Sequence, residues 1–277
     1  MKNDDDFDIP EGDFIPGIYN YCDAWCERCI YTKKCRNFAM QGEMEKEIES
    51  DKRREKSIEE NKDFWDQVNK TVEEAAELID EEMPLDKNDD FSFFGDTEFD
   101  EDAEDAMEDY EKIRQKAKNH DLSKVSWGYE KAVDKWFEDT KETLKIEYSE
   151  EKYSLSITYP EIVDENILKS ISESVELVRW YHIQIWVKIQ RALSGYFEEI
   201  EDTYLFEDFP IKDHDGSAFV VLLGIDRSIG AWNNLYSKLN PERESIKPMI
   251  KMLLWLRPEV EKMFPKARTF VWPPVDF

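Results

Sequence analysis

The chain has 277 residues and a formal net charge of −28. A surface this acidic repels phosphate backbones and anionic lipids, so neither nucleic-acid binding through a basic face nor membrane docking is expected. Disordered acidic chains are poor in aromatic residues, whereas this chain has 9 Trp, 12 Tyr and 16 Phe. We therefore expect a folded protein, long enough for one large or two ordinary domains.

The composition favours helices over sheets. Only 9 Gly and 11 Pro leave few of the turns that a many-stranded sheet requires, and residues with high helix propensity are abundant. We predict an all-α fold: a multi-helix bundle with a central apolar helix and an N-terminal four-cysteine metal-binding segment. Residues 1–40 would form that segment, residues 41–149 an acidic helical region and residues 150–277 a helical core region, all within one continuous fold.

The first residues bear on the compartment. Residues 1–14 (MKNDDDFDIPEGDF) lack the basic stretch followed by an apolar run that is typical of a secretory signal. We therefore expect a cytoplasmic protein. In that reducing compartment, four cysteines are more often metal ligands or free thiols than two disulfides.

All four cysteines lie in one short stretch, Cys22, Cys26, Cys29 and Cys35, in the pattern C-x3-C-x2-C-x5-C. On a helix with about 100° between residues, the first three would share one face. The chain can then fold back to bring Cys35 close as a fourth ligand. Because every cysteine of the chain is gathered here, we predict a metal site rather than four unrelated thiols.

The spacing bears on which metal is bound. Zinc takes four tetrahedral ligands, usually from two C-x2-C pairs that a longer stretch separates. This chain has one C-x2-C pair and no such spacer. A cubane iron–sulfur cluster is wider, and closely spaced cysteines along a short segment can surround it. We expect a [4Fe-4S] cluster, with Zn²⁺ as the alternative.

The order Cys26-x2-Cys29-x5-Cys35 resembles the end of the cluster motif in endonuclease III-class DNA glycosylases and in the CRISPR-associated and AddB-type exonucleases. In those families a more remote cysteine completes a [4Fe-4S] site. The resemblance implies that Cys22 is the fourth ligand here, at a much shorter distance along the sequence. It covers about 14 of the 277 residues and says nothing of a common fold. The string PGIYNYCDAWCERC also resembles the start of an uncharacterised bacterial protein family.

The first three cysteines, C-x3-C-x2-C, also spell the triad of the radical SAM family. That resemblance implies a partial βα barrel and an iron left open for the cofactor. The chain has neither repeated βα units nor a glycine-rich cofactor strand, and it offers a fourth thiol. We therefore do not expect radical SAM chemistry.

The next part of the chain is acidic and helical in pattern. Residues 1–149 hold 22 basic and 44 acidic side chains, and the segment 96–111 has 10 acidic residues and no basic one. We interpret this segment as a solvated surface; the alternative is a surface that docks a basic protein partner. Helical periodicity and its interruptions predict one or two helices over 43–82, a loop over 84–99, helices over 101–119 and 123–145, and a short hairpin or a connection over 145–159.

The C-terminal half has clearer periodicity. A helical segment runs from 160 to about 201, and its part 175–197 is apolar nearly all round, which makes it the candidate central helix. The stretch Asp213–Ser217 (DHDGS) has the residues of a loop and a helix N-cap. It predicts a helix over 217–239, and a last helix follows over about 242–263.

A polar stripe interrupts the candidate central helix. Gln184, Lys188 and Arg191 recur at helical spacing, so they share one face. The stripe either reaches solvent and acidic neighbours or faces Asp226 and Arg227 of the following helix. In the second case Lys188, Arg191, Asp226 and Arg227 would line a polar pocket for an anionic ligand, because buried charges need partners.

Two other signals bear on enzymatic activity. The string Gly224–Arg227 (GIDR) resembles the G-x-D-R segment of RecB-like nucleases, which implies a downstream strand with an acidic residue followed by x-Lys; none is evident. No glutamate stands three residues before any of the three histidines, so a di-iron bundle is not expected. His182 lies in an apolar stretch and is interpreted as a hydrogen-bonded core histidine. No nucleophile paired with a base emerges, and no catalytic residue is predicted.

The sequence therefore predicts a cytoplasmic metal-binding protein that carries a [4Fe-4S] cluster in a redox, sensing or structural role. The alternative is an acidic interaction or adapter protein with a structural zinc site. An iron–sulfur nuclease-like enzyme is a third and weaker hypothesis. We expect no nucleic-acid partner and no membrane association.

Overall fold

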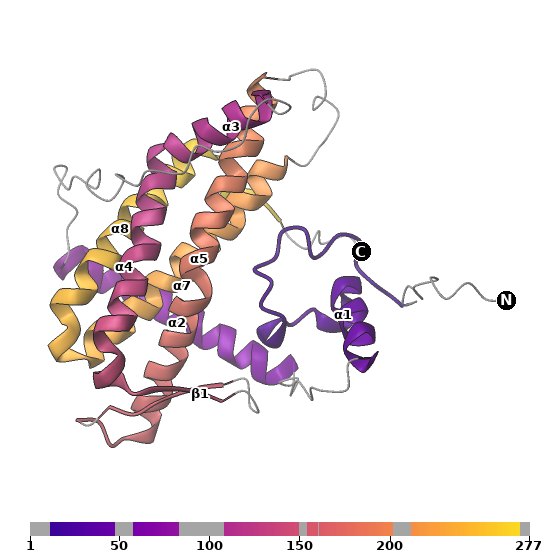
Figure 1. The fold of residues 1–277 in the computed structure, drawn as a ribbon. Coiled ribbons are helices and arrows are strands. Elements are labelled where there is room, and N and C mark those ends of the chain that lie inside the picture. The colour runs from indigo at the N-terminus through magenta and orange to yellow at the C-terminus, as the bar shows by residue number, and fades with distance from the viewer. Residues whose placement is uncertain are drawn as a thin grey trace.

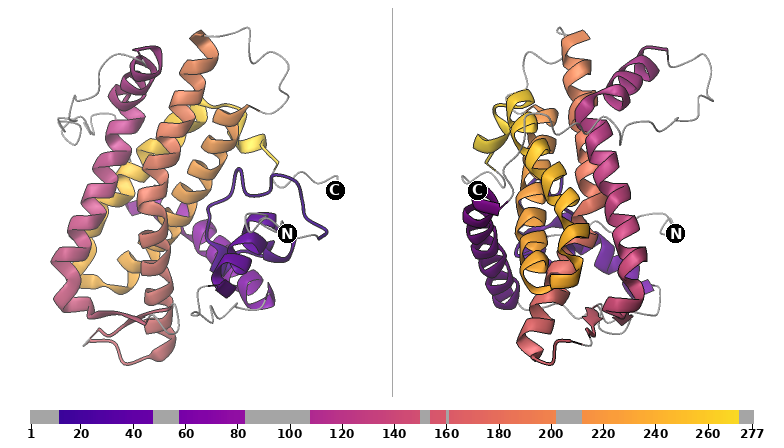
Figure 2. Two further views of the ribbon diagram at one scale, coloured as in Figure 1. Left: turned by 45° about the vertical axis from the view of Figure 1, so that its right-hand side comes forward. Right: turned by 90° about the vertical axis from the view of Figure 1, so that its left-hand side faces the viewer.

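A computed structural model describes residues 12–47, 58–82, 108–149, 154–159, 161–201 and 212–271. These residues form an assembly of helices with one small hairpin (Figures 1 and 2), so the predicted all-α fold is confirmed. The α-helices are α1 (Arg36–Glu47), α2 (Ile58–Glu82), α3 (Glu108–Asn119), α4 (Asp121–Leu144), α5 (Glu165–Glu201), α7 (Asp213–Lys238) and α8 (Arg243–Met263).

Helices α5 and α7 pair along their length at the centre of the molecule. Helix α5 also packs on α3 and α4, and α7 packs on α2 and α8. The apolar residues of α5 recur at intervals of three and four, which puts a buried stripe on the side that its neighbours cover. The members of this stripe with almost no exposed surface include Ile171, Val175, Val178, Tyr181, Ile185, Ile189 and Leu193.

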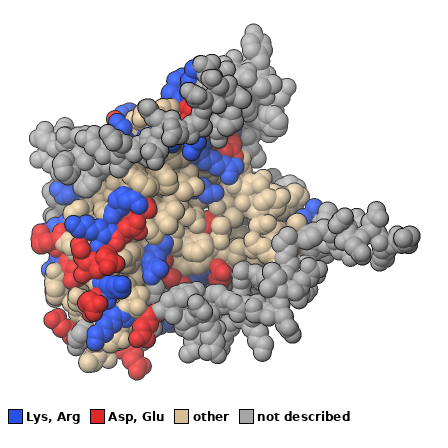
Figure 3. Space-filling view, in the orientation of Figure 1, with Lys and Arg blue, Asp and Glu red and all other residues tan. Residues whose placement is uncertain are grey.

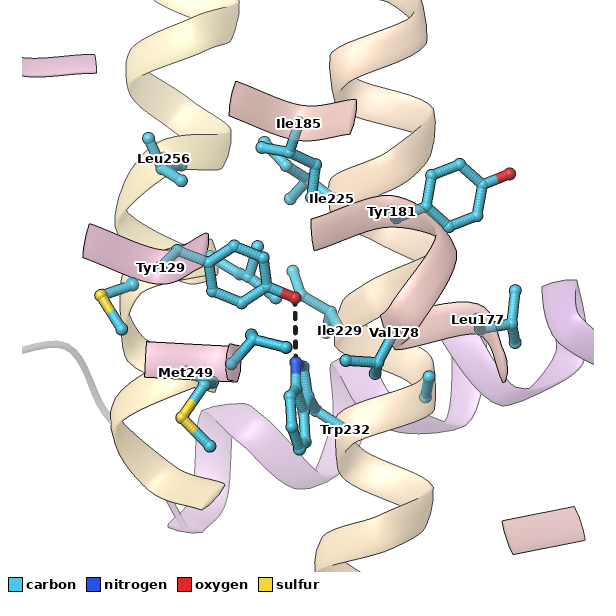
Figure 4. Close-up of a cluster of buried hydrophobic side chains, with 14 of the residues drawn as sticks. Tyr129, Leu177, Val178, Tyr181, Ile185, Ile225, Ile229, Trp232, Met249 and Leu256 are labelled. Carbon is cyan, nitrogen blue, oxygen red and sulfur yellow. Dashed lines mark hydrogen bonds between the residues drawn. The ribbon is translucent and has the colours of Figure 1, made fainter. Parts of the chain in front are cut away.

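The core contains large aromatic side chains with satisfied polar atoms (Figure 4). Trp232 of α7 is fully buried, and its Nε1 donates a hydrogen bond of 3.0 Å to the hydroxyl of Tyr129 on α4. Trp136 meets the Trp232 ring edge to face, with 4.9 Å between ring centroids. The buried cluster includes Trp25, Phe64 and Trp232, one from each of the three predicted regions.

Several predicted boundaries match the structure closely. Helix α4 begins after His120, whose Nδ1 accepts a hydrogen bond of 3.2 Å from the backbone N–H of Leu122. It ends at Lys145, which has the left-handed backbone (φ 39°) that stops many helices. The alternating pattern that follows forms antiparallel strands β1 (Ile146–Ser149) and β2 (Ser154–Ile157), in register Ile146 to Ile157. The predicted loop over 84–99 lies outside the described residues.

One predicted boundary is wrong. Residues Asp213–Ser217 are the first turns of α7 and not a loop. Acidic Asp213 and Asp215 in the first turn suit the positive end of the helix dipole. Gly216 serves packing rather than a turn, because a Cβ there would lie 2.4 Å from Cδ1 of Tyr21.

Charges of both signs interleave on the face that Figure 3 shows, over the residues that the structure describes. Most of the acidic segment 96–111 lies outside those residues, and only its last four positions belong to α3. Among the described residues, no helix combines the length and apolarity that crossing a bilayer requires.

A glycine lets α2 and α7 approach closely, and this gives a first prediction. A Cβ on Gly230 would lie 2.9 Å from Cγ2 and 3.0 Å from the backbone nitrogen of Val72. We expect Gly230→Ala to lower the free energy of unfolding by about 1–3 kcal/mol, because overpacking outweighs the better helix propensity of alanine. Urea unfolding monitored by circular dichroism measures this change.

Gly195→Ala on α5 is the matched control. The nearest atom to its Cβ would be Cβ of His214 at 3.6 Å, an ordinary contact. We expect this variant to be neutral or stabilised by up to about 1 kcal/mol. Equal effects of the two substitutions would contradict the assigned contact between α2 and α7.

Candidate metal centre

The cysteine-bearing segment folds as a compact loop beside the central helices. It consists of turns over 16–22, the 3₁₀ helices η1 (Cys26–Arg28) and η2 (Thr32–Lys34), and the connections between them. The backbone N–H of Ile15 closes the loop by donating a 3.0 Å hydrogen bond to the carbonyl of Lys34. The segment lies on the side of the molecule where the described chain also ends (Figure 1).

The expectation that Cys22, Cys26 and Cys29 share one face of a helix is wrong. Ala24 has a left-handed backbone (φ 56°), which a right-handed helix does not allow. The carboxylate of Asp23 caps the resulting turn by accepting a 3.2 Å hydrogen bond from the N–H of Trp25. The loop, and not a helical repeat, therefore places these cysteines.

Asp23 joins this loop to α5 and α7. Its backbone carbonyl accepts hydrogen bonds from Trp180 Nε1 (3.0 Å) and Gln184 Nε2 (2.6 Å). Its Oδ2 accepts a 2.5 Å hydrogen bond from the Tyr181 hydroxyl and forms a 2.9 Å ion pair with Arg227. The Asp23 and Arg227 side chains are only 16% and 14% exposed, so the pair is largely shielded from solvent.

Two further side chains anchor the loop. Trp25 is buried and stacks on Trp180, with 4.9 Å between ring centroids and 15° between ring planes. Arg28 is also buried, forms a 2.6 Å ion pair with Glu176 of α5, and lies over the Phe64 ring of α2. The residues between the first three cysteines therefore hold the loop on the core.

The four cysteines form no disulfide and are partly buried. Backbone N–H groups of Tyr31 and Phe38 lie 3.3 and 3.5 Å from the Sγ atoms of Cys29 and Cys35. Such N–H···S contacts are among the interactions that tune iron–sulfur clusters. They leave the sulfur lone pairs partly satisfied without blocking ligation.

The thiols influence one another. Burial, Glu27 and the other three cysteines raise the pKa of Cys26 to about 12. Burial is also the main cause that raises the pKa of Cys29 to about 11, and the pKa of Cys22 shifts in the same direction for the same reason. A metal centre here would therefore release protons as it binds.

The distances between the thiols bear on which metal fits. A tetrahedral zinc with bonds of about 2.3 Å holds its sulfurs about 3.8 Å apart. No three of the four Sγ atoms, all within the described residues, lie within 4.8 Å of one another. The four Sγ atoms are therefore not gathered around a single tetrahedral ion in this structure.

The predicted polar pocket residues have several different partners. Gln184 of the stripe and Arg227 of α7 both bind Asp23, so these two residues contact the cysteine loop. Arg191 pairs with Asp213 at 2.5 Å.

Asp226 lies away from this group, because Arg257 (3.0 Å) and Arg268 (2.5 Å) bind it. Lys188 lies near Cys22, whose charge acts on it, and burial lowers the pKa of its ammonium group. The candidate pocket residues are thus divided between the loop contact and separate ion pairs.

Sequence reasoning did not find Asp23, Trp25, Trp180 or Tyr181 as parts of this site. The sequence did offer one signal: Asp23 and Trp25 stand between Cys22 and Cys26, and a loop exposed to solvent does not require an aromatic residue there. Comparison with protein-family models, with curated proteins and with solved structures gives no match to this chain.

Proposed function

We propose that the chain binds a [4Fe-4S] cluster through Cys22, Cys26, Cys29 and Cys35. One observation carries the proposal: all four cysteines, partly buried and free of disulfides, share one loop that is fixed on the helical core. When bound, the cluster would supply one-electron exchange or a covalent brace for the loop.

The residues of this chain would position such a cluster. Asp23, Trp25 and Arg28 fix the backbone between the ligands on α2, α5 and α7. Lys188 would place a positive charge near Cys22, one of the proposed ligands. With every iron held by a thiolate of the chain, the proposed roles are electron transfer, redox sensing and structural bracing.

Metal analysis of the protein purified without oxygen tests the proposal. We expect about four irons and four sulfides per chain, with broad visible absorption that bleaches on reduction. One zinc per chain with no iron would overturn it and favour the structural zinc site of the adapter alternative. A reversible bleach favours a redox or sensing role, whereas a cluster that cannot be reduced without unfolding favours bracing.

Cys26→Ser should lower the iron content per chain at least about tenfold. Losing a ligand should weaken metal affinity by more than the roughly 10–100-fold that the loss of an outer-shell partner costs. Since metal binding is coupled to folding of its site, amide hydrogens of residues 18–36 should also exchange faster. Lys33→Gln, at an exposed position between Cys29 and Cys35, is the control and should keep its iron. Full iron content in Cys26→Ser would remove this cysteine from the ligand set.

The other functional hypotheses have less support. The acidic surface proposed to dock a basic partner lies mostly outside the described residues and stays a prediction. The Gly224–Arg227 string lies inside helix α7, whereas the nuclease resemblance implies a sheet. The described strands form one two-stranded hairpin, which gives that hypothesis no scaffold.

A further inference from the structure

A second group of ligand-type side chains lies where α4 packs on α5, away from the cysteine loop. Glu130 and Asp134 stand one turn apart on α4, and His182 comes from α5. The ligand atoms of these three residues all lie within 4.8 Å of one another. Glu130 and His182 are buried, whereas the Asp134 side chain is half exposed.

The hydrogen bonding of His182 leaves one ring nitrogen free for a cation. Its Nδ1 lies 2.8 Å from the backbone carbonyl of Arg179. A carbonyl only accepts, so Nδ1 must carry the hydrogen, and Nε2 of the neutral ring presents its lone pair. That lone pair faces Oδ1 of Asp134 at 3.4 Å. Two electron-rich atoms in this arrangement require a proton or a metal ion between them.

The distance fits a metal ion. Zinc binds histidine nitrogen at about 2.0–2.1 Å and carboxylate oxygen at about 2.0–2.2 Å, which places two tetrahedral ligand atoms about 3.4 Å apart. The His182 to Asp134 separation has this value. A histidine whose other nitrogen donates to a backbone carbonyl is also the usual arrangement of a metal ligand, because that bond fixes the tautomer and the ring orientation.

Glu130 adds a third ligand. Its side chain is 8% exposed, and its Oε2 is buried without a hydrogen bond. The neighbouring Lys131 lies 2.9 Å from this oxygen, donates its hydrogen bond to Oε1, and lies 3.4 Å from Asp134. The Lys131 side chain is half exposed, so it can turn to solvent when a divalent ion replaces its ammonium group.

We propose that Glu130, Asp134 and His182 bind a divalent transition-metal ion, for which zinc is the best match. One imidazole and two carboxylates are ligands that zinc accepts, and three protein ligands leave a fourth position for water. That position would open on the side of the exposed Asp134. The ion would join α4 to α5, and the site is independent of the cysteine centre.

Zinc titration by calorimetry tests the site, using the full chain with its cysteine centre as purified. We expect one further zinc per chain, and Asp134→Asn should weaken its binding at least about tenfold. Because Asp134 is half exposed, this variant should fold. Asp139→Asn, an exposed carboxylate on the same helix, is the matched control and should bind as the wild type does.

Lys131→Met separates a metal site from an ordinary ion-pair cluster. Removing the competing ammonium group should raise the zinc affinity about tenfold, because like charges a few ångströms apart repel strongly in a partly buried site. No further zinc in the wild type would overturn the proposal and leave His182 and Asp134 as an ordinary contact between α4 and α5. Equal binding in wild type and Asp134→Asn would overturn it as well.

Discussion

Replacing Trp232 by alanine is expected to lower the free energy of unfolding by about 3–5 kcal/mol. Trp232 is fully buried on α7 and contacts Tyr129 and Trp136 of α4, so alanine would leave a cavity that close-packed neighbours fill only in part. The substitution also removes the donor to the Tyr129 hydroxyl and the edge-to-face contact with Trp136. Urea unfolding followed by circular dichroism gives the value.

Two companion variants separate these contributions. Tyr129→Phe leaves the Trp232 indole N–H buried without an acceptor and should cost about 1–3 kcal/mol. Val163→Ala truncates a side chain that is 92% exposed and should change stability by no more than about 0.5 kcal/mol. If Trp232→Ala cost no more than Val163→Ala, the assignment of Trp232 to the core would be wrong.

The parts of this fold that sequence predicts are those set by local periodicity. The apolar repeat of α5 and the alternating residues around Tyr148 depend on neighbours within a few positions. The first gives the right element, and the second forms the hairpin, one of the two alternatives that the sequence left open. The predicted start of α7 was wrong because a glycine, such as Gly216, is typical of a loop. Glycine is needed at this position because Tyr21, almost two hundred residues earlier in the chain, packs against it.

The candidate site depends on contacts of the same long range. The cysteines are visible in sequence because their spacing is local. Their placement is not, because Asp23 meets Tyr181 and Arg227 across 158 and 204 residues. The left-handed backbone at Ala24 carries no signal either, since alanine adopts it rarely. Sequence therefore singled out the four cysteines as candidate ligands but not the loop geometry or its anchor.

Asp23→Asn is expected to lower the free energy of unfolding by about 3 kcal/mol, because removing one partner of a buried ion pair leaves an uncompensated charge. The value lies at the lower end of the range for such pairs, since both side chains keep some exposure. Arg227 also lies over the Trp65 ring, so it cannot leave for solvent without giving up that contact. Hydrogen exchange over residues 18–36 should rise together with the loss of stability.

The double variant Asp23→Asn/Arg227→Met tests the cause. Because methionine removes the orphaned charge and keeps an apolar contact, the double variant should be more stable than Asp23→Asn alone. Asp13→Asn removes the carboxylate of the exposed pair with Lys34 in the same loop and should cost no more than about 1 kcal/mol. If Asp13→Asn and Asp23→Asn had the same effect, the loop would be held by its own contacts, and Arg227 would have no part in placing the cysteines.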